Sequence, residues 1–235
     1  MSSGGGIRVL HLFSNCKWTG PAEPALNLCC ALRSAGVDAD FACAPDAGKS
    51  LNRVVEAARE RGVEPILDLH LSKHRDPLRN WRDGRALTRL LGAGRYDLVH
   101  CHLDNDHGIA AGPAGRLGIP LVRSSYHGAG FPAHGRYRRL LRGTRYLLEP
   151  SRKAMERDGA AFGFPAARMR VVPGAVDTGR FDPGRELPDG RARLGLGADA
   201  LVVGIVARMQ THRHYEDLFA AFGEAAGAFP EAHLV

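Results

Sequence analysis

The sequence predicts an α/β fold in which a Rossmann-like parallel sheet forms one domain and a second Rossmann-like domain is incomplete. Two observations carry this expectation. Short apolar runs alternate with helical patterns over most of the chain, and one Gly- and Pro-rich stretch then interrupts them. Repeated strand–helix–strand succession is typical of βαβ units, whose strands pair in parallel with helices on both faces. Such sheets bind ligands at the carboxyl ends of their strands.

Seven short apolar runs are candidate strands of the first domain. They are Arg8–Phe13, Ala39–Cys43, Pro65–Leu69, Leu98–His102, Leu121–Ser124, Arg145–Leu148 and Arg170–Val172. Between the first two, Ala25, Leu28, Cys29 and Leu32 recur at the spacing of one helix face. The segment SLNRVVEAARERG repeats this arrangement and ends at Gly62, as helices often end at glycine.

A break in composition follows the seventh candidate strand. Residues 178–199 hold much Gly, Pro and Asp and little apolar periodicity, which indicates a linker. After it come a buried strand (LVVGIVARM), an amphipathic helix (HYEDLFAAFGEAAGAF) and the start of another strand (EAHLV). We therefore expect a first domain over residues 1–177, a linker over 178–199, and the opening of a truncated second domain over 200–235. One βα unit cannot close a hydrophobic core by itself.

The bulk composition is that of a soluble protein, with 44% hydrophobic and 24% charged residues among 235. No apolar stretch is long enough to cross a bilayer, and the first one is too short for a signal peptide. The five cysteines are odd in number and form no CxxC pair, which favours buried thiols in a reducing compartment over disulfides. We expect a cytoplasmic protein.

Arginine gives the chain a formal net charge of +7, and the positive charge gathers in two runs. Seven basic residues lie between Lys73 and Arg95 against two acidic ones, and a second run spans His134 to Lys153. Both runs could be solvated helix faces, or they could attract phosphates of an anionic lipid surface, a phosphorylated acceptor or nucleic acid. Nucleic acid ranks last, because the runs lack a stacking pattern of interleaved aromatic residues and no known nucleic-acid motif is present.

The residues between the first strand and the first helix would allow a ligand to come close to the backbone. Thr19 and Gly20 stand at the junction, and Pro21 and Pro24 fit a first helical turn, where no N–H partner is needed. Gly20 has no Cβ, so a ligand phosphate can come near the N–H groups at the positive end of the helix. A tight Gly-Pro turn without a ligand is the alternative interpretation.

A histidine-rich segment, HCHLDNDH, overlaps the end of the fourth candidate strand. It resembles the H-x-H-x-D-H zinc motif of metallo-β-lactamase-like hydrolases, except that Asn105 stands where that motif has its last histidine. The candidate ligands are His100, His102, Asp104, Asp106 and His107. Alternate positions of a strand share a face, so a metal-dependent hydrolase is one alternative function. We expect no metal, because strand-end histidines without one are more common.

An ordered series of motifs follows the Gly20 turn. The motifs are VHCHLD, RSSYHG, EPSRKAMERDGAAFGFPAARMRVVPGAVDTGRF and VGIVARMQTHRHYEDLFAAF. From about Arg8 to its end, the chain resembles the family 4 glycosyltransferases, retaining enzymes of the two-domain GT-B architecture. The family pattern VSE…L…GVP…RV.VIPNGVD…RF is matched by Ser151, Gly163, Pro165, Val171, Pro173, Gly174, Val176, Asp177 and Phe181. Its GRL…K pattern is matched by Arg208, with Arg213 in the place of the lysine.

This resemblance implies roles for individual residues. The Gly20 loop would lie near the donor diphosphate, and His127 would face the transferred sugar as the catalytic residue. Arg208 and Arg213 would bind the pyrophosphate and neutralise the leaving group. The acceptor-side residues would be Thr19, His102 and Tyr126.

We therefore predict a retaining, hexosyl-type glycosyltransferase that moves a sugar from a UDP- or GDP-linked donor to a lipid or polysaccharide acceptor of the cell envelope. No metal or other cofactor is expected, because two arginines and a helix N-terminus can stabilise the leaving group. The basic runs would meet the acceptor or the inner face of a membrane. The family's E-x₇-E region would fall beyond Val235, so a non-catalytic acceptor-binding fragment is the alternative from another class.

Overall fold

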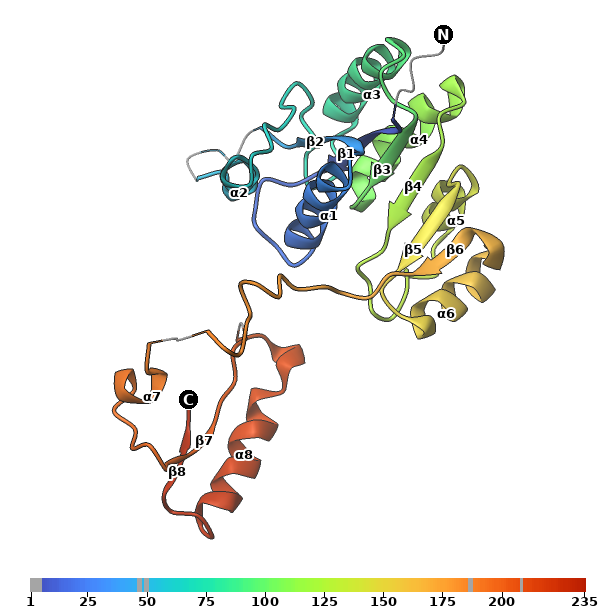
Figure 1. Ribbon diagram of the computed structural model, residues 1–235. Helices are drawn as coiled ribbons and strands as arrows, with labels where there is room; N and C mark the ends of the chain where they lie inside the picture. Colours follow the sequence, from blue (N-terminus) through green and yellow to red (C-terminus); the bar gives the residue numbers. More distant parts are fainter. Residues whose placement is uncertain (1–5, 46–47, 49–50, 186–187, 208) are drawn as a thin grey trace. The chain divides into compact units, whose positions relative to one another are not determined.

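The computed structural model describes residues 6–45, 48, 51–185, 188–207 and 209–235. The chain divides into two compact units, one up to Ala175 and one from Val176 to Val235. The sequence-based boundary, after Asp177, lies two residues further along the chain. Figure 1 shows the elements of both units.

The first unit is built on a six-stranded parallel sheet with the order β2-β1-β3-β4-β5-β6 (Figure 1). The strands are β1 (Arg8–Phe13), β2 (Asp38–Cys43), β3 (Leu98–Cys101), β4 (Leu121–Ser124), β5 (Tyr146–Glu149) and β6 (Met169–Val171). The helices are α1 (Ala22–Ser34), α2 (Arg53–Glu60), α3 (Pro77–Gly92), α4 (Asp104–Leu117), α5 (Gly135–Arg142), α6 (Arg152–Phe162) and the short η1 (Ala166–Arg168). The predicted Rossmann-like parallel sheet is confirmed.

The order of the strands reverses at β1, because β2 pairs with one of its edges and β3 with the other. In an open parallel sheet, ligands bind at the carboxyl ends of the strands where such a reversal occurs. The segments that leave β1 and β3 therefore frame the expected site. They are residues 14–21 and 102–103.

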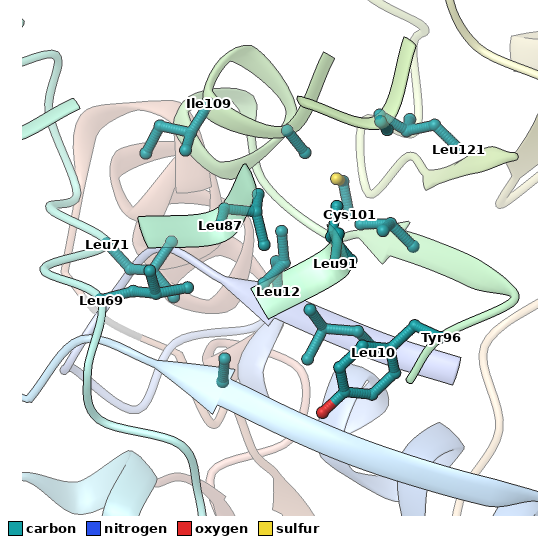
Figure 2. Packing of buried hydrophobic residues seen from close by; sticks show 14 of the residues in the cluster. Leu10, Leu12, Leu69, Leu71, Leu87, Leu91, Tyr96, Cys101, Ile109 and Leu121 are labelled. Carbon is teal, nitrogen blue, oxygen red and sulfur yellow. The ribbon is translucent and has the colours of Figure 1, made fainter. Parts of the chain in front are cut away.

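Side chains alternate across the sheet and fill a hydrophobic cluster on each face. Leu10 and Leu12 of β1 pack with leucines of α3 on one face, as Figure 2 shows. Val9 and Phe13 lie on the other face, where they pack with α1 and α2. Strands that are buried on both faces are apolar at nearly every position, which is why most of these strands could be predicted from the sequence.

The strand predicted over Pro65–Leu69 is wrong. Only Ile66 pairs with β2, in a single parallel bridge to Ala42. The Ile66 N–H donates to the Phe41 carbonyl at 2.8 Å, and its own carbonyl accepts from the Cys43 N–H at 3.3 Å. Proline at the start of the segment has no N–H to donate to a ladder.

Asp83 of α3 binds the backbone that follows this bridge. Its buried carboxylate accepts hydrogen bonds from the N–H groups of His70 at 2.8 Å and Leu71 at 2.9 Å. The His70 Nδ1 lies 2.9 Å from the same carboxylate. Leu71 has a φ of 41°, a left-handed value that residues with a side chain seldom adopt. The bonds to Asp83 thus stabilise a turn that directs Leu71 into the core instead of extending the sheet.

The second unit contains two parallel strands and one long helix. Its elements are α7 (Gly190–Arg193), β7 (Leu201–Val203), η2 (Thr211–Arg213), α8 (Tyr215–Ala226) and β8 (Ala232–Leu234). The short helix α7 lies inside the predicted linker. It forms because the Asp189 side chain accepts from the N–H groups of Arg191 and Ala192 and so caps it.

The apolar side chains of the second unit keep much of their surface in water. None of its described residues is buried, and Phe219 of α8 is 50% exposed. A two-stranded sheet with one helix offers too little surface to enclose them.

Replacing Asp83 by alanine should lower the free energy of unfolding by about 2–3 kcal/mol, because two backbone N–H groups lose a charged acceptor. Urea unfolding of the variant and the wild type measures the difference. Asp68→Ala is the matched control, since that aspartate is exposed and its loss should change stability little. Equal stability of the two variants would contradict the role given to Asp83.

Candidate active site

Three histidine side chains gather where the strand order reverses. His11 of β1 pairs in register with His100 of β3, and His102 follows at the carboxyl end of β3. The ring centroids lie 5.0 Å apart for His11 and His100, 5.3 Å for His11 and His102, and 4.5 Å for His100 and His102. All three side chains are buried. Together they form a stacked cluster under the expected site, which we call the histidine cluster.

His102 connects the histidine cluster to Tyr126, which follows β4. Its Nε2 lies 3.0 Å from Nδ1 of His11, and its Nδ1 lies 2.7 Å from the Tyr126 hydroxyl. Burial lowers the pKa of His11 to about 4 and that of His102 well below its ordinary value, so both rings are neutral at pH 7. A neutral imidazole carries one N–H, so the proton on His102 bonds either to Tyr126 or to His11.

The same burial changes the place of His102 in the site. The sequence put His102 on the acceptor side, but its ring is fully enclosed. Tyr126 is partly exposed. The His102 ring is therefore screened from solvent and bonds to the partly exposed Tyr126 through the tyrosine hydroxyl.

The histidine cluster is also the group of described residues best placed for a metal ion. One ligand nitrogen from each histidine lies within 4.8 Å of the other two. The Nε2 of His11 has no hydrogen-bond partner among the described residues, whereas its Nδ1 bonds to His102. Three imidazoles are a donor set that suits zinc.

The segment HCHLDNDH, which resembles a zinc motif, does not assemble as one centre in the described residues. Asp104 accepts a hydrogen bond from Arg123 at 2.9 Å, and His107 lies 2.9 Å from the Thr144 hydroxyl. Asp106 binds backbone N–H groups instead. Residues beyond His102 turn into α4, so successive side chains leave in different directions.

Asp106 joins the loop after β1 to the loop after β3. One of its carboxylate oxygens accepts from the Ser14 N–H at 2.8 Å, and its own N–H donates to the Ser14 hydroxyl at 3.1 Å. The other oxygen accepts from the N–H groups of His102 at 3.2 Å and Leu103 at 3.0 Å. Burial raises the pKa of Asp106 to about 7, although Arg123 and these hydrogen bonds oppose the shift. An acidic residue at the third helical position is the signal that could have revealed this role.

Thr19 and Gly20 lie in the turn that precedes α1. The Ala22 N–H donates to the Thr19 carbonyl at 2.8 Å and closes the turn. Gly20 is exposed, and a Cβ added there would meet no described atom within 4 Å. The position therefore leaves space for an anion beside the first N–H groups of the helix.

His127 is exposed on a loop that Asp158 of α6 holds. Both carboxylate oxygens of Asp158 accept from the Phe131 N–H, at 3.0 and 2.9 Å. Gly130, with a φ of 80°, donates its N–H to the His127 carbonyl at 2.8 Å. A Cβ at Gly130 would collide with the Asp158 carboxylate, so this position requires glycine. The His127 ring packs on Phe131, with ring centroids 5.4 Å apart.

Glu149, at the end of β5, is a second buried carboxyl under this loop. Burial, and then the neighbouring Asp158, raise the pKa of Glu149 to about 8. Burial also raises the pKa of Asp158. Two adjacent carboxylates do not readily ionise together. Because Glu149 stays protonated, Asp158 can be ionised and accept the hydrogen bond from the Phe131 N–H. Sequence analysis missed both residues, because nothing in their spacing marks them as neighbours.

Arg123 of β4 places a positive charge below the site. Its side chain is 2% exposed, and its Nη2 donates to Asp104 at 2.9 Å. The guanidinium carbon lies 5.5 Å from the centre of the Phe131 ring. Among the described residues its Nε and Nη1 have no hydrogen-bond partner. This buried cation stabilises the ionised forms of the aspartates around it.

The predicted site residues fall into both units. Gly20, His127 and the bonded pair of His102 and Tyr126 belong to the first unit. Arg213 lies in the second unit, exposed at the end of η2, and Arg208 lies outside the described residues. The arrangement described above concerns the first unit alone.

Solved structures with this architecture are GT-B glycosyltransferases and related epimerases. Alr3699/HepE of Anabaena, solved with UDP and glucose, superposes with a TM-score of 0.71 at 15% identity, over 97% of this chain and 60% of that one. A glycosyltransferase of Rickettsia africae gives 0.70 at 11% identity, over 87% and 54%. The UDP-GlcNAc 2-epimerase of Neisseria meningitidis gives 0.58 at 15% identity, over 97% and 65%. At these identities the similarity establishes the fold.

The family follows from the sequence match. The model of Glycosyltransferase Family 4 matches residues 19–180, well over half of the chain. The chain belongs to this family. A curated relative, the D-inositol 3-phosphate glycosyltransferase of Actinosynnema mirum, is 30% identical over 131 residues. That alignment covers 50% of this chain and 31% of the relative.

Replacing Glu149 by glutamine should flatten the pH dependence of stability. The folded protein holds the Glu149 proton up to about pH 8, against an ordinary pKa of 4.5, so it binds more protons than the unfolded chain between these values. The free energy of unfolding of the wild type therefore falls as the pH rises through this range. Glutamine resembles the protonated carboxyl and removes this contribution.

Urea unfolding at about pH 5 and about pH 8 measures this effect. The loss of stability between the two conditions should be smaller in Glu149→Gln than in the wild type. Glu156→Gln, an exposed position on α6, should behave as the wild type does. An equal loss in all three proteins would contradict the buried proton.

Proposed function

We propose that the protein is a retaining glycosyltransferase, which transfers a hexosyl unit from a UDP- or GDP-linked sugar to a lipid or polysaccharide acceptor of the cell envelope. The observation that carries this proposal is the family match over residues 19–180. The exposed His127 at the carboxyl end of β4 supports it. The Anabaena structure with UDP and glucose has the same fold.

In this proposal the chain acts mainly through positioning and positive charge. The diphosphate of the donor lies near Gly20 and the N-terminus of α1, where backbone N–H groups point outward. Arg208 and Arg213 neutralise the negative charge that develops as the nucleoside diphosphate departs. Arginine at position 213 keeps the positive charge of lysine, and its planar guanidinium can donate two parallel hydrogen bonds to one phosphate. His127 contacts the transferred sugar.

We place the acceptor beside Thr19 and Tyr126. His102 is a positioning residue here, because its bond to the Tyr126 hydroxyl fixes that group. The Actinosynnema mirum relative is named for a phosphorylated acceptor, D-inositol 3-phosphate. A phosphorylated acceptor agrees with the basic character of this chain.

We assign an anionic membrane or acceptor to a surface of exposed arginines. They lie in Arg79–Arg89 of α3 and in Arg136–Arg145, which covers α5 and the turn after it. No described helix is both long enough and apolar enough to cross a bilayer. Attraction between arginines and anionic headgroups would hold the protein at the inner face of a membrane. A cytoplasmic protein with peripheral membrane contact is therefore part of the proposal.

Catalysis further requires the donor-binding part of the second domain. The chain spans about a third of the curated relative and about 60% of the Anabaena structure. We assign residues 1–177 to the acceptor-side domain, 178–199 to the linker and 200–235 to the start of the donor-binding domain. The intact mass of the protein from its native source tests this, since a mass well above 25.3 kDa means that the chain continues.

A second candidate is an acceptor-binding protein without transferase activity. The observation that favours it is the second unit, none of whose described residues is buried. Limited proteolysis separates the two proposals, because a stable core that ends near Asp177, together with an unchanged native mass, favours the binding protein.

In the protein at its native length, His127→Ala should reduce kcat/KM by about 100-fold or more, because a contact made to the reacting sugar is lost. Transfer from a panel of UDP- and GDP-sugars, followed by release of the nucleoside diphosphate, measures it. His134→Ala, an exposed histidine seven positions further on, is the matched control and should leave kcat/KM unchanged. Equal rates for the two variants would exclude His127 from the reaction.

Reversing the charge of Arg82 and Arg89, both exposed on α3, should abolish binding to vesicles that contain phosphatidylglycerol. The effect is electrostatic, so binding of the wild type should also weaken as salt is raised. Vesicle flotation measures the bound fraction. Unchanged binding by the reversed variant would rule out this surface.

A further inference from the structure

A groove of about 700 Å³ lies between α3, α4 and α5. This volume is within the range of small-molecule sites. The polar and aromatic residues that line it are Arg75, Asn80, Trp81, Asn105, Arg136 and Arg139. No aspartate or glutamate is among its described lining residues. Both basic runs of the sequence contribute to this one groove, which we call the arginine groove.

The arginine groove lies on the opposite face of the sheet from the histidine cluster. Ile109 of α4 lines the groove and also packs in the cluster of Leu10 and Leu12. His11 lies between these two leucines along β1, so its side chain leaves the other face. The groove is therefore separate from the site at the carboxyl ends of β1 and β3.

The positive charge of the arginine groove is not neutralised within the first unit. Arg75 and Arg139 are exposed and form no ion pair with any residue that the structure describes. Arg136 makes one long bond, from Nη2 to the Asp104 carbonyl at 3.4 Å. Three cations around one concave surface raise the local concentration of anions.

Two asparagines with fixed side chains and one exposed tryptophan complete the polar and aromatic lining of the groove. The Asn80 amide donates to Asn105 at 2.8 Å, and the Asn105 amide donates to the Ser72 carbonyl at 2.7 Å, which fixes both side chains. Trp81 is 58% exposed. An indole offers an apolar face beside these polar groups. At Gly108 an added Cβ would meet no described atom within 4 Å, so the groove comes close to the α4 backbone.

We propose that the arginine groove binds a phosphate ester. Guanidinium groups bind phosphate in a bidentate manner, and Trp81 would cover the sugar or polyol that carries it. The inference goes beyond the proposed function, because the groove is separate from the site at which we place the acceptor. The phosphate can belong to a soluble ester or to a lipid headgroup.

Calorimetric titration of the protein with glucose 6-phosphate, with glucose as the uncharged match, tests this proposal. Glucose 6-phosphate should bind and glucose should not. The double variant Arg136→Gln/Arg139→Gln should weaken binding by about tenfold or more, because two charge-assisted contacts are lost. Gly108→Leu should also weaken it, since leucine fills the groove while favouring the helix.

The control is Arg95→Gln/Lys153→Gln, which removes the same charge at two exposed positions outside the groove. It should bind glucose 6-phosphate as the wild type does. Equal weakening by the control and the groove variants would overturn the proposal, because binding would then follow net charge alone. Thermal unfolding of each variant verifies that it is folded.

Vesicles of phosphatidylglycerol identify the source of the phosphate. If the groove variants lose vesicle binding and glucose 6-phosphate does not bind, the ligand is a lipid headgroup. If glucose 6-phosphate binds and depends on the groove, the ligand is a soluble phosphate ester. If neither probe depends on the groove variants, the proposal is wrong. These titrations need no donor and no transfer, so their failure is distinct from that of the proposed reaction.

Discussion

Buried aspartates that accept hydrogen bonds from backbone N–H groups hold the loops of the first unit in place. Asp106 binds the segments after β1 and β3 to each other. Asp158 holds the segment that carries His127, and Asp83 holds the backbone that follows the Ile66 bridge. A buried carboxylate is stable only when such donors or a cation compensate for its lost hydration. Each loop is therefore held by hydrogen bonds that are lost if the aspartate or the loop backbone moves.

These bonds decide what the site offers to a ligand. The rings of the histidine cluster are neutral because they are buried, so they add hydrogen bonds and no charge. Exposed groups such as His127 and the Gly20 turn stand on loops that the buried carboxylates support. A rigid frame with exposed contact groups suits a reaction that depends on orientation and electrostatics. Family membership and this frame support the same proposal from independent observations.

The arginines of the first unit differ in burial and in partners. Arg123 is buried and pairs with Asp104, so its charge serves the structure. The arginines of α3 and α5 are exposed, and those that line the groove have no acidic partner among the described residues. One part of the positive charge stabilises the fold, and the other part is available for anions from solution.

The sequence by itself determined the fold class, most strands and the family. Strands buried on both faces must be continuous apolar runs, and helices beside them must repeat at helical spacing, so both patterns are visible in the sequence. The start of α1 was likewise predictable, because proline fits the first helical turn, where no N–H partner is required. The strand predicted over Pro65–Leu69 is wrong, because an apolar run also results when a chain buries its side chains under a helix.

The tertiary structure alone decided which distant residues meet. His11 joins His100 and His102 only because β1 and β3 are neighbours in the sheet. Glu149 and Asp158 influence each other's pKa because β5 and α6 pack together, and no spacing in the sequence marks that contact. The burial of His102 was hidden for the same reason. Burial and long-range pairing depend on strand order, and strand order is a property of the folded chain.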